Sequence, residues 1–326
     1  MEDNRATNLA TSLPFSLSTS WHGTAHPSLA ETFAEARALG FSRVELYMHY
    51  TPRQLERAAE LAREHQLTIT SLHSPCPVPV DSAGERIALG DWLASTDAAR
   101  RTLAVDAIRR TIDTAAELGA RAVIVHLGIV EMQSHQDQIF AAIRADGLDS
   151  PTHRDLLEQT RRERESQAGP HLEAALQSAR ELGQHACGTG VTIGLETRDL
   201  DFQVPGLAEY EPIFQACAGL PVGYWHDVGH AQKLENAGLA RHQEYLRRYG
   251  DRLVGMHLHD IRMERDHLAP GQGEMPFSLL APYAHPGVVQ TVELSPRVPE
   301  EQVPGAIEVL LAAGFNSRPQ DPRARA

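Results

Sequence analysis

The sequence has very little lysine and very little cysteine. Lys233 is its only lysine, and it lies in the polar segment HAQKLENAG. Covalent catalysis through a Schiff base needs a lysine amine in the active site, so the sequence disfavours that class of aldolase. The three cysteines, Cys76, Cys187 and Cys217, are scattered and form no CxxC motif. This usage is typical of a reducing compartment, and we expect a cytoplasmic protein.

Long apolar runs and an excess of basic residues are also missing. No segment approaches the roughly 18 consecutive apolar residues that a membrane span needs, and the N-terminus, MEDNRATNLATSLPF, lacks the apolar core of a secretion signal. Lys and Arg number 30 against 43 Asp and Glu, which gives a net charge of −13. Proteins that bind the phosphate backbone of nucleic acids usually present a basic face. We therefore expect neither a membrane nor a nucleic acid as a partner, and a homo-oligomer remains compatible with the sequence.

Short β-branched runs alternate with longer helical patterns along most of the chain, as in βαβ units. Strands are predicted at 15–18, 43–47, 68–73, 121–126, 191–196, 222–227, 253–259 and 288–294. Helices are predicted most clearly at 28–39, 52–65, 98–118, 171–187 and 300–313. Eight strands in a chain of 326 residues favour an α/β fold of the closed (β/α)8 barrel type. No glycine-rich nucleotide-binding loop follows any of the predicted strands.

The predicted domain organisation is a single barrel at 15–314, with an N-terminal extension at 1–14 and a disordered tail at 315–326. Two connections are long: 74–97 follows the third strand, and 127–153 follows the fourth. Both leave the carboxyl end of a strand, where barrel enzymes keep their catalytic groups. We expect these long loops to cover the site as lids.

Imidazole and carboxylate groups stand at the carboxyl ends of six consecutive predicted strands. These residues are His73, His126, Glu196, Asp227, His257 and Glu293. Any one of them alone would more often be a structural hydrogen-bonding residue, but six together are hard to explain in that way. Converging carboxylates would repel one another and take up protons unless a cation lay among them. Mixed imidazole and carboxylate ligands suit Mn²⁺, Zn²⁺, Co²⁺ or Fe²⁺, and the sequence does not choose among these metals.

The motifs around these residues resemble those of one superfamily. They are HSP at His73, VIVHLG around His126, GLET around Glu196, HDVGH at 226–230, MHLHD at 256–260 and VEL around Glu293. From about residue 15 to residue 314, the chain resembles the xylose-isomerase-like barrels, which include sugar isomerases and epimerases, inosose dehydratases and the endonuclease IV class of abasic-site nucleases. The most distinctive pieces are the DxxH spacing of Asp227 and His230 and the HLxPGxG stretch that starts at His267.

The resemblance implies a central divalent metal and an acid–base pair. The metal ligands would be Glu196, Asp227, His257 and Glu293. In the epimerase branch, the residues that match Glu196 and Glu293 also transfer the proton.

The resemblance to the nuclease branch implies further ions. There, His73 and His126 would join Glu196 around a second ion, and His230 and His267 would help to hold a third. The third site normally includes an aspartate two residues before the last histidine, whereas this chain has Arg265 at that position and Asp266 one residue later. We therefore expect the central ion and a second one at partial occupancy, but no complete third site. His230 and His267 would instead bind substrate hydroxyl groups.

Three functions are compatible with such a site. The favoured one is a metal-dependent isomerase or epimerase, or a dehydratase, which acts on a sugar, sugar phosphate or related hydroxycarbonyl compound by proton transfer through an enediolate. A nuclease that cleaves abasic DNA is the alternative, and the acidic net charge, Arg265 and the GLETRD segment oppose it. A barrel that only binds a metabolite would not need both glutamates.

Several residues near the predicted metal ligands have two possible roles. Glu45 either orients a ligand histidine or is an ordinary buried hydrogen-bonding residue. Of His259 and Asp260, we expect at most one to enter the site, because successive side chains of a strand point to opposite faces. Three arginines, Arg262, Arg265 and Arg297, follow the last two strands and either bind a phosphate group or are surface residues.

Overall fold

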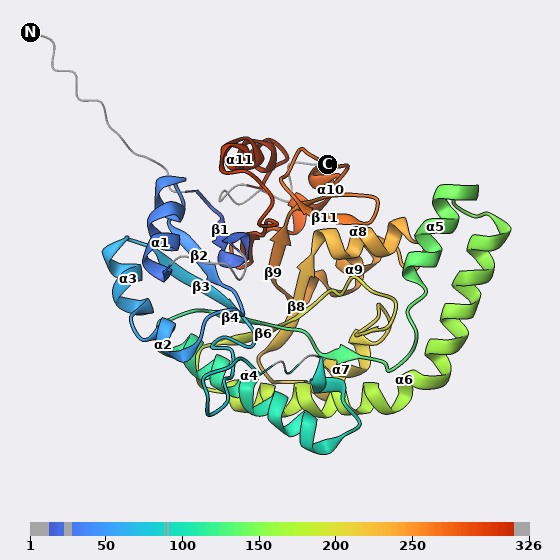
Figure 1. The fold of residues 1–326 in the computed structure, drawn as a ribbon, viewed down its shortest axis with the longest axis horizontal. Coiled ribbons are helices and arrows are strands. Elements are labelled where there is room, and N and C mark those ends of the chain that lie inside the picture. Colours follow the sequence, from blue (N-terminus) through green and yellow to red (C-terminus); the bar gives the residue numbers. More distant parts are fainter. Residues whose placement is uncertain (1–12, 23–27, 88, 90, 316–326) are drawn as a thin grey trace, which may run out of the picture.

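The computed structural model describes residues 13–22, 28–87, 89 and 91–315 (Figure 1). The predicted N-terminal extension at 1–14 and the predicted disordered tail at 315–326 therefore lie almost wholly outside the described residues. Among the helices of the described part, none is long and apolar enough to cross a membrane.

The described chain forms a closed barrel of eight parallel strands, which confirms the predicted (β/α)8 fold. The strands are β1 (Ser16–Ser18), β2 (Arg43–Leu46), β3 (Thr68–His73), β4 (Ala122–Val125), β6 (Thr192–Glu196), β8 (Val222–Asp227), β9 (Leu253–Leu258) and β12 (Val289–Val292). Each overlaps one predicted strand. The barrel closes where β1 pairs with both β2 and β12, so the carboxyl ends of all eight strands meet at one mouth.

One tryptophan in the core of the barrel packs next to two glycines. Trp225 on β8 is fully buried, and a Cβ atom on Gly255 would lie only 2.1 Å from its Cζ3 atom. A Cβ atom on Gly194 would lie 2.9 Å from its Cε3 atom. The indole ring also packs against the ring of His257, with the centroids 5.1 Å apart. These contacts hold a predicted ligand histidine against a rigid part of the core.

Helices cover the outside of the barrel. The α-helices are α1 (Leu29–Ala38), α2 (Pro52–Leu55), α3 (Ala58–Glu64), α4 (Ala98–Leu118), α5 (Gln136–Asp146), α6 (Pro151–Ala186), α7 (Tyr210–Ala216), α8 (Val228–Asn236), α9 (His242–Tyr249), α10 (Phe277–Leu280) and α11 (Val303–Ala312). Short 3-10 helices lie at Thr19–His22, Trp92–Ala94, Gly250–Arg252, Ala281–Tyr283 and Glu300–Gln302. The predicted helix at 52–65 is divided into α2 and α3.

Helix starts and stops follow local chemistry. The Asp97 side chain caps α4 by accepting hydrogen bonds from the backbone N–H groups of Ala99 and Arg100. The same helix ends at Gly119, whose φ of 72° is left-handed and favours glycine. The predicted helix at 171–187 is only the second half of α6, which has 36 residues and contains Pro170. Figure 1 shows α6 changing direction along its length, as a helix with an internal proline commonly does.

The two predicted lids differ in structure. The 74–97 connection contains turns and one short 3-10 helix, whereas the connection after β4 contains strand β5 (Gly128–Ile129) and helix α5. The predicted long connection at 127–153 is thus present, and it contains regular structure as well as loop. Ile139 and Phe140 of α5 are buried in a small apolar cluster to which α6 contributes, and this packing stabilises the helix. Strand β5 also pairs with β7 (Gln203–Val204), and α5 with the adjoining half of α6 extends beyond the barrel on one side (Figure 1).

Candidate metal centre

The six predicted site residues meet at the mouth of the barrel in two groups that share Glu196. The central group comprises Glu196, Asp227, His257 and Glu293, and the second group comprises His73, His126 and Glu196. Within each group, the potential ligand atoms all lie within 4.8 Å of one another. The structure therefore brings together every residue that the sequence placed at a strand end.

The central group has three carboxylates around one ring nitrogen. His257 Nδ1 lies 2.6 Å from Glu196 Oε1, 3.0 Å from Glu293 Oε2 and 3.6 Å from Asp227 Oδ2. One Nδ1–H group cannot donate good hydrogen bonds to three separate carboxylates. All four side chains are buried, so water cannot supply the missing charge compensation. A divalent cation among the four oxygen and nitrogen atoms would provide it, and this donor set fits Mn²⁺, Co²⁺, Fe²⁺ or Zn²⁺.

Glu45 fixes the orientation of His257. The Nε2–H group of His257 donates to Glu45 Oε1 at 3.1 Å, and Ser71 Oγ donates to Glu45 Oε2 at 2.8 Å. Glu45 and His257 are both fully buried. When Nε2 carries the proton that Glu45 accepts, the lone pair of Nδ1 faces the three carboxylates. Of the two interpretations of Glu45, the structure thus supports the one in which it orients a predicted ligand.

The charges of the central group depend on one another. Burial alone would lower the pKa of His257, but the carboxylates of Glu293, Glu45 and Glu196 hold it well above its ordinary value. Burial would raise the pKa of Glu293, but His257 and His267 lower it to about 2. Burial likewise opposes ionisation of Glu196, yet its hydrogen bonds with His126 and His257 and the positive charge of His257 keep its pKa well below its ordinary value. The carboxylates are therefore ionised and need positive charge beside them.

The second group uses the other oxygen of Glu196. His126 Nε2 makes a short hydrogen bond to Glu196 Oε2, and His73 Nε2 lies 3.4 Å from the same atom. Burial and Arg198 lower the pKa of His126 to about 3, so its imidazole is neutral and able to bind a metal. Since Oε1 faces the central group and Oε2 faces the second group, Glu196 would be a ligand in both groups if each held an ion. Whether a second ion binds stays a prediction.

Arg198 is a site residue that the sequence analysis missed. It follows Glu196 by two residues, is 8% exposed, and its Nη1 atom lies 3.9 Å from Glu196 Oε2. Within the described part of the chain, its Nε and Nη1 atoms have no hydrogen-bond partner. The alternation of side chains along an extended segment is the signal that places the two residues on one side. A fixed positive charge so close to Oε2 weakens the binding of a cation at the second group.

His230 and His267 lie beside the central group on a wall of the site. Their ring centroids are 5.5 Å apart, and His267 Nε2 lies 3.8 Å from Glu293 Oε2. The Nδ1–H group of His230 donates to the Thr197 carbonyl at 2.9 Å, and His267 Nδ1 lies 3.1 Å from Asp266. The Nε2 atom of each ring thus remains available for a ligand. Burial would lower the pKa of His267, but Asp266 and Glu293 raise it to about 9.

A third group of potential ligands surrounds His230 and His267. His230 and His267 do not stand apart from carboxylates, because their ligand atoms lie within 4.8 Å of those of Asp227 and His259. His259 accepts a hydrogen bond at Nδ1 from the backbone N–H of His267, so its proton is on Nε2, which donates to Asp227 at 2.9 Å. This tautomer makes His259 a donor that orients Asp227 rather than a ligand. The number of ions stays a prediction.

Asp260 has a different role from its neighbour His259. Its carboxylate accepts hydrogen bonds from the backbone N–H groups of Gly271, Gly273 and Met275, and so shapes the HLxPGxG segment. A Cβ atom on Gly273 would lie 2.4 Å from Asp260 Oδ1, which explains the glycine there. Of this pair, only His259 therefore enters the site, as expected. The segment begins within the second strand of a hairpin formed by β10 (Asp260–Arg262) and β11 (Arg265–Leu268).

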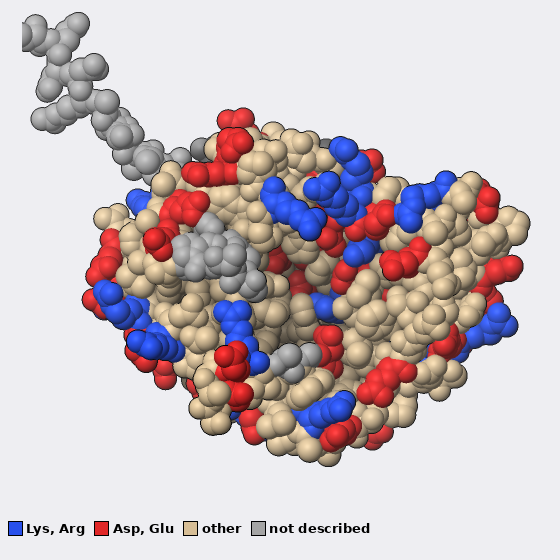
Figure 2. Space-filling view, viewed as in Figure 1, with Lys and Arg blue, Asp and Glu red and all other residues tan. Residues whose placement is uncertain are grey.

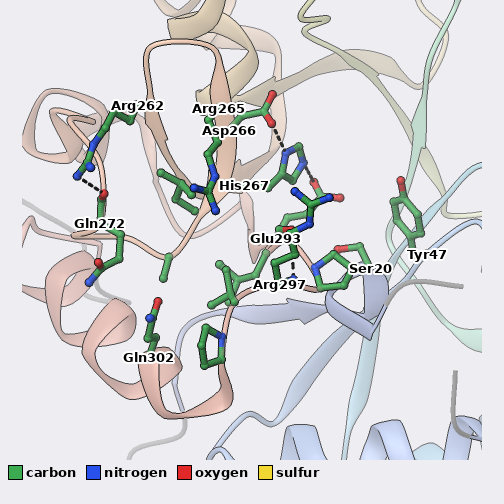
Figure 3. Close-up of a pocket in the computed structure, with 17 residues that line it drawn as sticks. Ser20, Tyr47, Arg262, Arg265, Asp266, His267, Gln272, Glu293, Arg297 and Gln302 are labelled. Carbon is green, nitrogen blue, oxygen red and sulfur yellow. Dashed lines mark hydrogen bonds and ion pairs between the residues drawn. The ribbon is translucent and has the colours of Figure 1, made fainter. Parts of the chain in front are cut away.

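The site opens into a cavity of about 660 Å³. Figure 3 shows that Glu293 and His267 line it together with Tyr47, Arg265 and Arg297. This face of the molecule is hollowed near its centre, with acidic atoms in the hollow and basic side chains above it (Figure 2). The volume is within the range of about 300–1,000 Å³ that is common for small-molecule sites. A compound of the size of a sugar can therefore reach Glu293.

Comparisons with known proteins agree with this architecture. The model of a family described as "Xylose isomerase-like TIM barrel" matches residues 33–312. A 3-keto-D-glucoside 4-epimerase from E. coli is 18% identical, with a TM-score of 0.64 over 92% of this chain and 99% of that chain. A D-tagatose 3-epimerase-like protein is 20% identical, with a TM-score of 0.62 over 92% and 96% of the two chains. A D-psicose 3-epimerase from Clostridium cellulolyticum is 13% identical, with a TM-score of 0.63 over 92% and 99%.

One sequence relative is longer than the region that matches this chain. An uncharacterized protein of Sinorhizobium fredii is 25% identical over 202 residues, which are 62% of this chain and 52% of that protein. The match thus spans about half the length of that relative. At these identities, the solved structures show a shared fold.

Proposed function

This chain belongs to the xylose isomerase-like TIM barrel family, and from that premise we propose that it is a divalent-metal-dependent isomerase or epimerase of sugars or related hydroxycarbonyl compounds. The observation that carries the proposal is the placement of Glu196 and Glu293. Both are buried at the mouth of the barrel, and their carboxylate oxygens lie 2.6 and 3.0 Å from the same atom, His257 Nδ1. Two carboxylates that converge in this way can both reach one small substrate.

Glu196, Asp227, His257 and Glu293 are the residues that would hold the metal. A bound divalent cation would supply a Lewis acid that stabilises negative charge on the carbonyl oxygen of the substrate. Glu45 and His259 would keep the ligands in place. Glu45 accepts a hydrogen bond from His257, and His259 donates one to Asp227, both inside the protein core.

The two glutamates would divide the proton transfer between them. One carboxylate accepts the proton from the carbon beside the carbonyl group, the C–H bond breaks, and its electron pair moves toward the carbonyl oxygen. The other glutamate, which is ionised in the free protein, would first have to take up a proton and would then return it to carbon. Return to the opposite face of the same carbon gives an epimer, and return to the neighbouring carbon gives an isomer. If the adjacent carbon instead loses its hydroxyl group as water, the product is that of a dehydratase.

Other residues of the wall would position the substrate. The Nε2 atoms of His230 and His267 are not used by hydrogen bonds to the described part of the protein, and they lie next to Glu293 and Asp227. We assign them to substrate hydroxyl groups. The connection at 74–97 and strand β5 follow strands that end in the site, so they would limit the access of water and protect a reactive carbanion-like species from side reactions.

A nuclease that acts on abasic DNA is the second candidate. The grouping of His73, His126 and Glu196 favours it, because clustered ions assist phosphodiester hydrolysis. The net charge of −13 opposes it, since binding to a phosphate backbone depends on basic residues. Arg198 opposes it as well, because its charge lies beside the oxygen that a second ion would need. We therefore rank it below the sugar isomerase or epimerase.

Hydrogen exchange at carbon tests the proposed function directly. Protein reconstituted with Mn²⁺ is incubated in D₂O with ketopentoses, ketohexoses and their phosphate and carboxylate derivatives, and NMR follows the loss of each C–H signal. We expect exchange with at least one compound, and none for Glu196→Gln or Glu293→Gln. Glu308→Gln is the matched control, because Glu308 is exposed on α11. Metal-loaded protein that exchanges no proton of any compound would contradict the proposal.

A further inference from the structure

Two arginines in the wall of the cavity have unused guanidinium groups. Arg265 on β11 and Arg297, which follows β12, both line the cavity that Glu293 and His267 also line. Neither guanidinium group makes a hydrogen bond or an ion pair with another described residue. Arg262, by contrast, donates to the Gln272 carbonyl at 2.9 Å. The cavity thus has two strong cationic donors without an acceptor.

The carboxylates of the same cavity are already partnered. Asp266 lies 3.1 Å from His267 Nδ1 and 3.5 Å from Lys233 Nζ. Glu293 faces His257 and His267, and it belongs to the proposed metal centre. Neither carboxylate is free to neutralise the arginines. In the free protein, water would solvate the two exposed guanidinium groups, so an anionic group of a ligand could bind them without breaking a contact within the described part of the protein.

The arrangement of the cavity suits a ligand with two different ends. Glu293, which is 4% exposed, lies at the inner end, whereas Arg265 and Arg297 are exposed. Figure 3 shows their side chains extending toward the part of the cavity where His267 lies. A guanidinium group presents N–H donors in a planar fork that matches the oxygens of a carboxylate or phosphate. A neutral sugar has no group that would neutralise this charge.

We propose that the substrate is an anionic sugar derivative, whose carboxylate or phosphate group binds to Arg265 and Arg297 while its hydroxycarbonyl end lies at Glu293. This inference rests on the proposed function and narrows its substrate class. The metal centre would act on the reacting carbons, and the two arginines would select the charged end. Sugar acids and sugar phosphates share the anionic oxygens that the arginines recognise.

Calorimetric titration of the Mn²⁺-loaded protein tests the inference. The probes are D-fructose, D-fructose 6-phosphate, D-fructuronate and inorganic phosphate. In the wild-type protein, we expect at least one of the two anionic sugars to bind ten or more times as tightly as D-fructose, and the better of the two identifies the source of the charge. In the Arg265→Gln/Arg297→Gln variant, this ratio should fall toward one, since each charged hydrogen bond contributes about tenfold or more.

Arg110→Gln is the matched control. Arg110 is exposed on α4, which does not line the cavity, so its substitution removes one arginine charge, compared with two in the double variant, without affecting the cavity. This variant should keep the wild-type ratio. Absence of a preference for anions in the wild-type protein, or its persistence in the double variant, would overturn the inference.

The calorimetric titration and the deuterium-exchange experiment together separate this inference from the proposed function. If neutral sugars exchange deuterium and no anion preference is found, the proposed function stands and the inference fails. If no sugar binds or exchanges, but binding of inorganic phosphate is lost in the double variant and kept in Arg110→Gln, the anion site is supported and the proposed function fails. Phosphate binding that does not depend on the two arginines counts against the anion site.

Discussion

The most informative single perturbation is the replacement of Glu45. This residue contacts no substrate, yet its Oε1 atom accepts the Nε2–H of His257 at 3.1 Å inside a fully buried pair. Glu45→Gln keeps an amide oxygen as acceptor but removes the negative charge that makes Nδ1 more basic. Glu45→Ala removes the acceptor as well, so the imidazole loses its fixed orientation.

The structure sets the expected magnitudes. Loss of a partner that orients a metal ligand typically weakens metal binding by about 10- to 100-fold, which corresponds to about 1.4–2.7 kcal/mol. We expect Glu45→Gln at the lower end and Glu45→Ala at the upper end. The alanine variant also leaves the Ser71 hydroxyl and the His257 Nε2–H unsatisfied in the core, which costs about 1–3 kcal/mol of folding stability for each group.

The assay is a competition titration of Mn²⁺ or Zn²⁺ against a chromophoric chelator, with circular dichroism as a check of folding. Ser71→Ala is the matched control, because it removes a hydrogen bond from the same buried network without touching His257. Its effect on metal affinity should be less than about threefold, well below the range for loss of an orienting partner. A folded Glu45→Ala variant that binds metal as tightly as the wild type would refute the orienting role.

Four further outcomes are expected. Glu293→Gln should lower turnover by about 10²- to 10⁴-fold with unchanged circular dichroism, whereas near-normal turnover would remove this residue from the mechanism. Gly255→Ala should destabilise the fold by about 1–3 kcal/mol in thermal denaturation, because its Cβ would lie 2.1 Å from Trp225, while Gly305→Ala, with nothing within 4 Å, should be neutral or slightly stabilising. Metal affinity should fall as pH falls, because His257 has a raised pKa and must release a proton to bind the cation. Calorimetry in two buffers with different ionisation enthalpies counts the protons released on metal binding. Binding without proton release would argue against His257 as a ligand. Abasic-site DNA should not be incised at enzymatic rates of about one per second or faster, and such incision would favour the nuclease instead.

The barrel and the convergence of the strand-end residues could be predicted because their signals are local. A β-branched run bounded by turns predicts a strand whatever surrounds it, and all eight predicted strands are present. In a closed parallel barrel the carboxyl ends of all strands meet, so residues that end separate strands must converge. The strand count and the positions of His73, Glu196, Asp227 and Glu293 were thus sufficient to predict that these side chains meet at the mouth of the barrel.

The helical insertion shows where local signals are ambiguous. Pro170 lacks a backbone N–H and predicts a break, yet α6 continues through it from residue 151 to residue 186. The packing of α6 against α4 and α5 stabilises the helix on both sides of the proline. Such packing depends on segments far apart in the chain, so propensity alone could not predict it.

The partners within the site were decided by the tertiary structure. Glu45 and His257 are 212 residues apart in sequence, and only the closure of the barrel brings their side chains into contact. The proton of His259 lies on Nε2 because a backbone N–H of the following hairpin occupies Nδ1. The sequence alone therefore determined which residue types reach the mouth of the barrel, since strand periodicity is a property of the local backbone. Which atoms face one another, and which guanidinium groups remain free, depends on register and packing between distant segments.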